Sequence, residues 1–449
     1  MGKPQVIEDE EHQRVHERVA AVDVAKASGM VCVRDPHPSR PGTRRSTVWQ
    51  VQATMGAVSE LAARLLRDGI EMVTLEPASD YWRIWFYLLE MAGVPVQLVS
   101  ASQAKNLKGR PKTDKLDAMW LARLTEMGML RPCFVPPKAI RALRDYTRAR
   151  IDLVRERTRC WQRLEKLLED AMIKVSPVAS ALDTDSVRGM LAALIKGERD
   201  PQVPAQLARG RMRGKIPALA QALHGMFDDH HGELAQLELD QITFLDQRIT
   251  RLETRITALI GEMPAAWGAD ATGETGPAAG TGPDAAVLPV LDRLDEIPGI
   301  SPQIAAAIIA ETGLDMTRFP TAGHLVSWAG LCRTANQSGP RTRKGSKGTG
   351  NTYLRGLLGQ AAIGAARTST FLGERYQRIA RRRGKAIAQV AVARSILVII
   401  WHLLSDRAAR YHDLGPDYYA SRTDKGRRIR NHVRQLEALG LTVTLTPAA

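Results

Sequence analysis

The chain has 449 residues, which is enough for two or three domains. Its 63 Lys and Arg against 48 Asp and Glu give a formal charge of +15, which favours a polyanionic partner such as nucleic acid. Four scattered cysteines form no CxxC pair, which argues against a zinc site or a disulfide framework. The polar start is not a signal peptide, and the longest apolar run, Ile396–Leu404, is too short to span a bilayer, so we expect a soluble intracellular protein.

Residues 15–130 alternate strand and helix signals. Apolar runs predict three antiparallel strands, with a hairpin turn at Ala27-Ser28-Gly29 and a helix opened by Ser59 further on. The order is strands 19–24, 30–34 and 47–53, helix 60–68, strand 71–75, helix 80–92, strand 95–99 and helix 113–128. Three antiparallel strands followed by alternating β and α elements are typical of a ribonuclease-H-like domain. The aromatic residues of helix 80–92 are expected in its core.

Four acids fall where such a domain would gather metal ligands. Asp23 lies within the first strand and Glu76 closes the fourth. An acid on a buried strand is costly unless a cation compensates it. Asp114 and Asp117 lie three apart on the last helix, so they share one face. The set predicts a two-metal site for phosphoryl transfer.

We expect two long helices next. Together they would form a helical or coiled-coil connector over 138–262. The first, over 138–172, is basic, and an irregular stretch over 176–215 follows it. The second, over about 232–262, carries apolar residues at alternating spacings of three and four, which favours a coiled coil. A hairpin within one chain and an oligomeric coil remain equally open. His230 and His231 lack ligand spacing and are interpreted as a loop at the start of this helix.

A flexible linker over 263–287, rich in Gly, Ala, Thr and Pro, separates this connector from a mostly helical domain over 288–405 and a polar tail over 406–449. The sequence around Ile297-Pro298-Gly299-Ile300 is similar to a helix-hairpin-helix, whose turn presents backbone N–H groups to phosphate. An ordinary packing role for this turn is equally open.

A glycine-rich basic segment follows Ser338-Gly339. Between Ser338 and Lys385 there are twelve basic residues and one acid, Glu374, which favours phosphate contacts. The predicted nucleic-acid-binding residues are Arg341, Arg343, Lys344, Lys347, Asn351, Arg355, Arg381, Arg382 and Arg383.

The motifs at both ends of the chain resemble one family, the DEDD-type insertion-sequence transposases, which are bridge-RNA-guided DNA recombinases. The motifs are VDVAK, LEP and KTDKLDA at the front, and IPGI, FPTAGHLVSWAGL, Gln337-Ser338-Gly339 and GNTYLR at the back. The resemblance implies a RuvC-like domain over 15–130, a coiled-coil connector and a carboxyl-terminal transposase domain.

The resemblance also implies a mechanism. Asp23, Glu76, Asp114 and Asp117 would be catalytic and would hold Mg²⁺, and Ser338 would be the nucleophile that forms a phosphoserine bond with DNA. Ser346 in the same segment is the alternative serine. The partners would be donor and target double-stranded DNA, a structured guide RNA and further copies of the chain, as a dimer or tetramer. The protein would lie in the prokaryotic cytoplasm at the nucleoid, without a membrane partner.

Two other functions remain open. A metal-dependent nuclease of the Holliday-junction type would use water as the nucleophile and would not need Ser338. A non-catalytic nucleic-acid-binding protein would keep the fold without the chemistry, although the presence of all four acids argues against it.

Overall fold

The computed structural model describes residues 15–40, 42–100, 113–263, 266, 288–338, 341–347, 350–422 and 425–445. The chain forms two compact units, residues 1–135 and 136–449. Most of the predicted linker over 263–287 lies outside the described residues.

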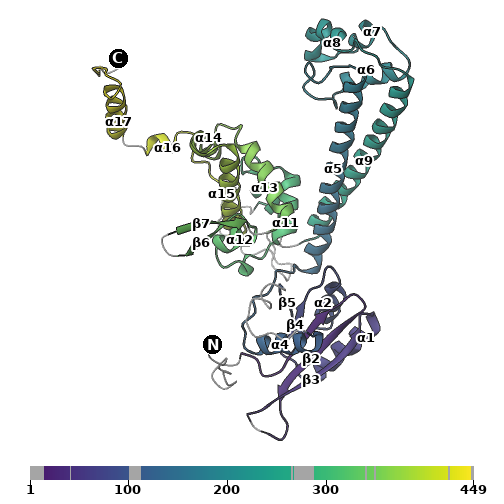
Figure 1. Ribbon diagram of the computed structural model, residues 1–449, viewed down its shortest axis with the longest axis vertical. Helices are drawn as coiled ribbons and strands as arrows, with labels where there is room; N and C mark the ends of the chain where they lie inside the picture. Colours follow the sequence, from purple (N-terminus) through teal and green to yellow (C-terminus); the bar gives the residue numbers. More distant parts are fainter. Residues whose placement is uncertain are drawn as a thin grey trace, which may run out of the picture. The chain divides into compact units, whose positions relative to one another are not determined.

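Unit 1 contains a five-stranded mixed sheet (Figure 1). The strands are β1 (Val19–Val24), β2 (Ser28–Pro36), β3 (Arg44–Gln52), β4 (Met72–Glu76) and β5 (Val96–Leu98), in the order β3-β2-β1-β4-β5. β1, β2 and β3 are antiparallel, whereas β4 and β5 run parallel to β1. This arrangement confirms the predicted order of three antiparallel strands followed by alternating β and α elements.

Helices cover both faces of this sheet. α1 (Met55–Arg67) and α2 (Trp82–Met91) cover one face, where Leu65 and Trp85 pack with Val22 in a buried core. α4 (Asp114–Glu126) covers the other face, where Leu121 packs with Ala21. Alternate residues of β1 therefore point to opposite helices. The full burial of Trp85 confirms that the aromatic residues of α2 include core residues.

Two predicted boundaries in unit 1 are wrong. The first hairpin turns over residues 25–28, where Ala25 N–H donates to the Ser28 carbonyl at 2.9 Å, so Ser28 and Gly29 already belong to β2. Helix α1 begins at Met55 and not after Ser59, because the Thr54 side chain accepts a hydrogen bond from Ala57 N–H and caps the helix. The first error arose because Ser28 and Gly29 suggested a turn, and the second because Ser59 suggested the start of a helix.

A buried ion cluster fixes the end of α4 to the sheet. Glu126 is 1% exposed, and its carboxylate lies 2.5 Å from Arg34 of β2 and 2.5 Å from Arg44 of β3. Removal of one member of a buried cluster leaves its partners uncompensated. Glu126 therefore anchors α4 at the start of β1, far from the predicted acidic site.

Replacing Glu126 with Ala should lower the free energy of unfolding by about 3 kcal/mol, because two largely buried guanidinium groups lose their shared partner. Urea unfolding of the full chain, followed by circular dichroism, measures this change. The control is Asp80→Ala, which removes an exposed ion pair with Arg83 and should change stability by less than about 1 kcal/mol. Equal effects of the two substitutions would contradict the anchoring role.

Cys32 lies in the core between the sheet and α4. Burial raises the pKa of its thiol to about 12, and the nearby charge of Arg34 lowers that pKa only in part. Because the thiolate is the reactive form, iodoacetamide at pH 8 should leave Cys32 unmodified in the folded protein and label it in urea. Rapid labelling of Cys32 without denaturant, read by mass spectrometry, would contradict this packing.

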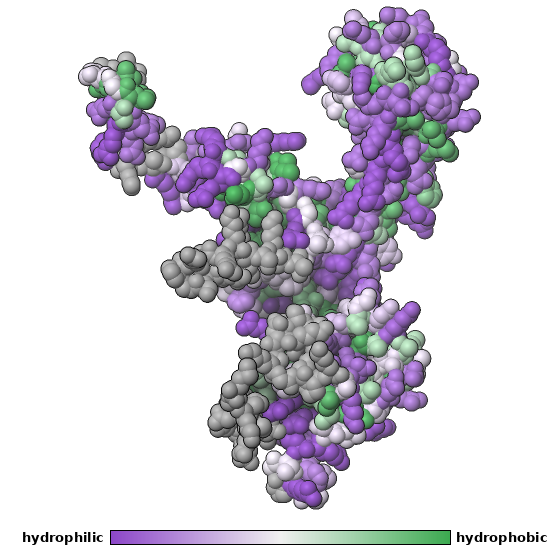
Figure 2. Space-filling model, viewed as in Figure 1, coloured by the Kyte–Doolittle hydropathy of each residue, from purple (hydrophilic) through white to green (hydrophobic). Residues whose placement is uncertain are grey.

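In unit 2, α5 (Lys138–Asp170) and α9 (Asp229–Gly261) form an antiparallel pair (Figure 1). Ion pairs Arg150–Glu253, Arg157–Asp246 and Arg163–Glu238 join them, with numbers that rise along α5 and fall along α9. The predicted apolar stripe is buried at Ile242, Leu245, Ile249, Ile256 and Leu259. The structure therefore favours the hairpin within one chain. Figure 2 shows that the visible surface of this hairpin is mostly hydrophilic, with small hydrophobic patches.

The stretch over 176–215 is not irregular as predicted. It contains α6 (Asp185–Ile195), α7 (Gln202–Ala205) and the 3₁₀ helix η2 (Gly210–Lys215), and α8 (Ile216–Ala222) follows. Thr184 caps α6, whose buried Val187, Met190, Leu191 and Leu194 have helical spacing. Of the prolines that suggested loops, Pro177 and Pro201 lie outside these short helices, and Pro204 lies within the single turn of α7.

The rest of unit 2 is mostly helical. Its elements are α10 (Val290–Asp295), α11 (Pro302–Thr312), η4 (Met316–Arg318), α12 (Ala322–Trp328), β6 (Arg333–Ser338), β7 (Arg341–Lys347), α13 (Thr352–Ala365), α14 (Phe371–Arg383), α15 (Lys385–Ser405), α16 (Tyr418–Ser421) and α17 (Lys425–Glu437). The predicted basic loop is thus largely a β-hairpin, β6–β7. The tail is partly anchored, because Arg410 pairs with Glu296 after α10.

One helix in the described part of the chain, α15, is long and apolar enough to cross a membrane by length and composition. Val392, Ile396 and Ile400 on this helix are fully buried within the protein, so a place in the core accounts for its apolar character.

Candidate functional site

Asp23 and Glu76 are direct neighbours in the sheet. β1 and β4 pair in parallel, and the register places Asp23 opposite Glu76. Ala21 and Thr74, two residues earlier on each strand, both face α4: Ala21 packs in the α4 core, and the Thr125 hydroxyl donates to Thr74 Oγ1 at 2.7 Å. Because strand side chains alternate, both acids project toward the α4 side.

The direction of α4 brings its two acids to the same edge of the sheet. Glu126, at the end of α4, pairs with Arg34, which lies beside Val19 at the start of β1. The first turn of α4, with Asp114 and Asp117, therefore lies toward the ends of β1 and β4. The strand ends that carry Asp23 and Glu76 and the first turn of α4 thus lie toward the same edge of the sheet.

The surroundings of the acids differ. Glu76 is 7% exposed and Asp23 and Asp117 are half-buried, whereas Asp114 is exposed. Thr113 caps α4 by accepting from Leu116 N–H, so both helix acids lie in the first turn, where the helix dipole favours negative charge. Carboxylates that crowd together repel one another unless a cation balances their charge. Hard oxygen donors in such a set fit a divalent cation such as Mg²⁺.

A second group of side chains that could bind a metal ion has its ligand atoms close together. Among the described residues, Asp170, His230 and His231 have ligand atoms within 4.8 Å of one another, and the sheet-edge acids form no such group. His231 Nδ1 lies 2.6 Å from Asp228, the residue that caps α9, and its Nε2 lies 3.4 Å from Asp170 at the end of α5. The predicted helix-start loop was wrong here, because both histidines lie in the first turn of α9. Their contacts join the ends of α5 and α9.

Ser338 is the last residue of β6 and pairs with Arg341, the first residue of β7. Arg341, Arg343, Lys344, Lys347 and the alternative serine, Ser346, all belong to β7. The side chains of this hairpin lie outside the described residues, so the structure gives only their backbone positions. Ser338 thus lies at the far end of the hairpin from the ends of α12 and α13.

The other predicted nucleic-acid-binding residues differ in their surroundings. Arg381, Arg382 and Arg383 are exposed in the last turn of α14. Asn351 uses its side chain within the protein: Oδ1 accepts from Leu354 N–H at 3.0 Å, and Nδ2 donates to Glu311 at 2.6 Å. Arg355 is half-buried in α13.

The turn that is similar to a helix-hairpin-helix packs inside unit 2. Gly299 has φ +89°, and a Cβ on it would lie 2.1 Å from the Ala361 carbonyl oxygen of α13. Contact between this turn and α13 favours the packing role over phosphate binding.

Sequence reasoning missed Glu311. It ends the apolar run Ala305–Ala310 of α11, it is 1% exposed, and it pairs with Arg144 and Arg148 of α5. A single acid after an apolar helical run was the available signal, but its partners lie more than 160 positions away in the chain.

Comparisons with known proteins identify related transposases. A family model of the IS110 DEDD transposases, described as "Transposase", matches residues 20–173, which include all four acids. A second, described as "Transposase IS116/IS110/IS902 family", matches residues 291–377, which include Ser338. An insertion element IS116 uncharacterized 44.8 kDa protein from Streptomyces clavuligerus is 25% identical over 317 residues, which cover 67% of this chain and 73% of that protein.

Two solved structures of RuvC from Thermus thermophilus are also similar to part of the chain. One is RuvC itself, 18% identical, with a TM-score of 0.21, covering 26% of this chain and 99% of that one. The other is RuvC in complex with a Holliday junction substrate, 17% identical, with a TM-score of 0.21, covering 26% and 100%. The two family models lie at opposite ends of the chain and name the same group of enzymes. The protein belongs to the IS116/IS110/IS902 family of transposases, enzymes that act on DNA.

Proposed function

We propose that this transposase cuts and exchanges DNA strands through a covalent phosphoserine intermediate, with Ser338 as the nucleophile. The observation that supports this most is the register pair Asp23–Glu76, with Asp114 and Asp117 of α4 at the same sheet edge. A catalytic site for phosphoryl transfer needs such a set of carboxylates.

The four carboxylates would hold Mg²⁺, which would supply charge stabilisation to the phosphate in the transition state. The residues of the chain have separate roles. Asp23 and Glu76 belong to adjacent strands of a rigid sheet, so their backbones are held in position without a bound ligand. Asp114 and Asp117 lie on a capped helix turn, which keeps them on the same side.

The proposed chemical step conserves the number of phosphodiester bonds. Ser338 Oγ would lose its proton and form a bond to a DNA phosphorus, and the bond from that phosphorus to one sugar oxygen would break. The released sugar hydroxyl would take up a proton. Attack by a sugar hydroxyl on the phosphoserine would reverse these changes and join a new strand, so the exchange needs no ATP.

The two halves of the proposed site come from different units of the chain. The carboxylates belong to unit 1 and Ser338 belongs to unit 2. A complete site therefore requires the two units to meet, and we propose that they come from different copies in a dimer or tetramer. The excess of basic residues, including the exposed Arg381, Arg382 and Arg383, supports contacts with donor and target DNA and a structured guide RNA. Such an enzyme would work in the cytoplasm at the nucleoid.

A hydrolytic nuclease is the second candidate. The observation that favours it is that all four carboxylates lie in unit 1, so a water nucleophile would need no residue from unit 2. The two candidates differ in whether a protein–DNA bond forms.

Metal-dependent cleavage tests what both candidates share. The full-length protein, RNA transcribed from the flanks of its element, and labelled donor and target DNA are incubated with Mg²⁺, with Mn²⁺ or with EDTA. We expect cleaved DNA with either ion and none with EDTA. Cleavage at an unchanged rate in EDTA would contradict the assignment of the carboxylates as metal ligands.

A further inference from the structure

A buried carboxylate joins three elements of unit 2. Arg148 of α5 donates to Glu311 through Nε at 2.7 Å and through a terminal nitrogen at 2.8 Å, and Asn351 Nδ2 donates to Glu311 at 2.6 Å. Glu311 is therefore held from α5 on one side and from the start of α13 on the other. Charge-assisted bonds of this kind to a buried group are strong and geometrically specific.

The same face of α5 also holds the backbone of α11. Arg144 donates to the carbonyl oxygens of Ala310 and Glu311 at 2.9 and 2.8 Å. These carbonyls lie in the last turn of α11, where helix carbonyls lack partners and a cation is favoured. Arg144 and Arg148 together fix the end of α11 against α5.

Tyr353, two residues after Asn351, makes the next contact with α5. Its hydroxyl donates to Asp152 at 2.9 Å, and the guanidinium groups of Arg148 and Arg155 lie 4.7 and 5.2 Å from its ring centroid. The four α5 residues involved are spaced by four, four and three positions, so they form one stripe on the helix. The first turn of α13 is thus fixed along this stripe.

The chain enters and leaves the β6–β7 hairpin at its base, which we call the hairpin root. The side of this root next to α12 is also fixed. Gly350 has φ +46°, and a Cβ there would lie 2.6 Å from the Ala329 carbonyl oxygen at the end of α12. The chain therefore enters the β6–β7 hairpin from α12 and leaves it through Gly350, which packs closely against that same helix end. Motion of the root would require the polar contacts of Asn351 and Tyr353 to change.

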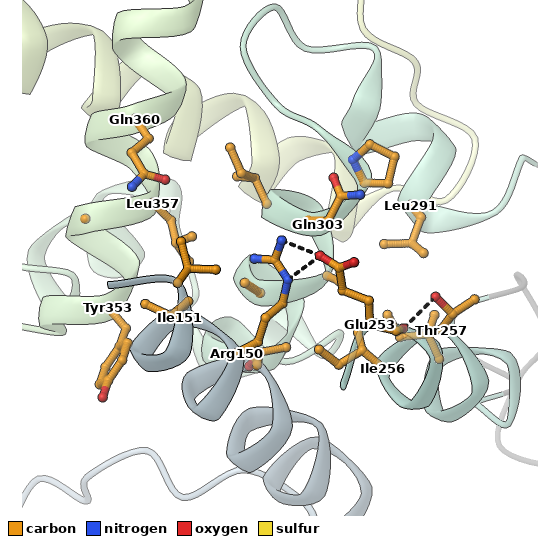
Figure 3. A pocket seen from close by; sticks show the side chains of 18 of the residues that line it. Arg150, Ile151, Glu253, Ile256, Thr257, Leu291, Gln303, Tyr353, Leu357 and Gln360 are labelled. Atoms are coloured by element: carbon orange, nitrogen blue, oxygen red, sulfur yellow. Dashed lines mark hydrogen bonds and ion pairs between the residues drawn. The ribbon is translucent and has the colours of Figure 1, made fainter. Parts of the chain in front are cut away.

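Apolar packing does not fill the contact between α5 and α13. A cavity of about 190 Å³ lies there, lined by residues of α5, α9, α10, α11 and α13. Figure 3 shows Tyr353 and Gln360 on one side of it and the Arg150–Glu253 pair near its centre. Because a cavity removes packing contacts, the orientation of α13 relative to α5 depends more on the polar contacts.

We propose that Glu311, Asn351 and Tyr353 are positioning residues that align the Ser338 hairpin on α5; this inference rests on the proposed function of Ser338. Ser338 lies roughly 16 Å along β6 from Arg333, at about 3.3 Å per residue, so a tilt of about 10° at the root moves it by about 3 Å. A misplacement of about 1 Å can cost a reaction roughly 100-fold.

The variant Asn351→Ser separates this role from helix capping. Its hydroxyl still caps α13, but serine is too short to keep the bond to Glu311. We expect single-turnover formation of the covalent DNA complex to slow by roughly 10- to 100-fold, with unchanged DNA affinity and circular dichroism. Tyr353→Phe, which removes only the bond to Asp152, should slow the same step. Asn431→Ser, an exposed position on α17, is the matched control and should cleave at the wild-type rate.

The outcomes separate this inference from the proposed function. If Ser338→Ala is inactive while Asn351→Ser and Tyr353→Phe react at the wild-type rate, the positioning role is wrong and the nucleophile stands. If Ser338→Ala itself cleaves at the wild-type rate, the proposed function falls and the inference falls with it. Loss of DNA affinity in Asn351→Ser, at an unchanged rate from bound complex, would instead indicate a binding role and overturn positioning.

Discussion

Asp23→Asn should lower DNA strand cleavage by about 1,000-fold or more, because removing one carboxylate weakens the charge that a catalytic cation requires. Asn has nearly the same shape as Asp, so the sheet should fold normally around it. Asp23 lies beside the largely buried Glu76. The substitution therefore removes the proposed metal ligand next to Glu76. The measurement is the single-turnover rate of cleavage at saturating protein.

The matched control for Asp23→Asn is Asp80→Asn. Asp80 is an exposed acid of the same unit, and it pairs only weakly with Arg83 at 3.3 Å. This variant should cleave at the wild-type rate, and both variants should bind DNA with wild-type affinity. Cleavage by Asp23→Asn at a rate close to wild type would remove the main support for the carboxylate site.

Ser338→Ala should abolish the covalent protein–DNA complex, because alanine has no atom that can bond to phosphorus. Cleavage should fall with it, because the proposed reaction uses no other nucleophile. Ser346→Ala is the matched control, because it deletes the same hydroxyl from β7 of the same hairpin. A gel run under denaturing conditions measures both, and a covalent complex lost only in Ser346→Ala would show that the two serines were assigned the wrong way round.

The sheet of unit 1 could be predicted because its signals are local. The apolar run at Val19–Val24 and the acid that closes Met72–Glu76 marked two buried strands, and Thr113 marked the start of α4. Their register could not be predicted, because parallel pairing joins residues about 50 positions apart. The structure added that Asp23 and Glu76 are direct partners.

Other features depended on tertiary contacts. The stripe on α9 predicted a partner helix without identifying it, and the structure pairs it with α5 of the same chain. Asn351 was predicted as a phosphate contact because it lies in a basic, glycine-rich segment, but its amide is occupied by Glu311 and by the cap of α13. A residue's local sequence does not reveal a buried partner 40 positions away.

These observations give the two motifs near the hairpin different roles. Ser338 is the last residue of β6, at the far end of the hairpin, where the proposed nucleophile would meet DNA. The GNTYLR block lies at its root, where Gly350, Asn351 and Tyr353 contact α12, α11 and α5. In the proposed mechanism the nucleophile lies at the far end of the hairpin, and the contacts that fix the hairpin lie at its root. This arrangement agrees with the general need to hold catalytic groups on rigid elements.

Mass spectrometry of the trapped protein–DNA complex tests most directly whether Ser338 becomes bonded to DNA. The protein is incubated with RNA, Mg²⁺ and DNA, denatured, and digested with nuclease and trypsin. Cleavage after Arg333 and Arg341 releases residues 334–341 with Ser338, whereas cleavage after Lys344 and Lys347 releases Ser346 in a separate peptide. A nucleotide on Ser338 is the predicted result. Cleaved DNA with no nucleotide on any serine would contradict the serine mechanism and establish hydrolysis by water.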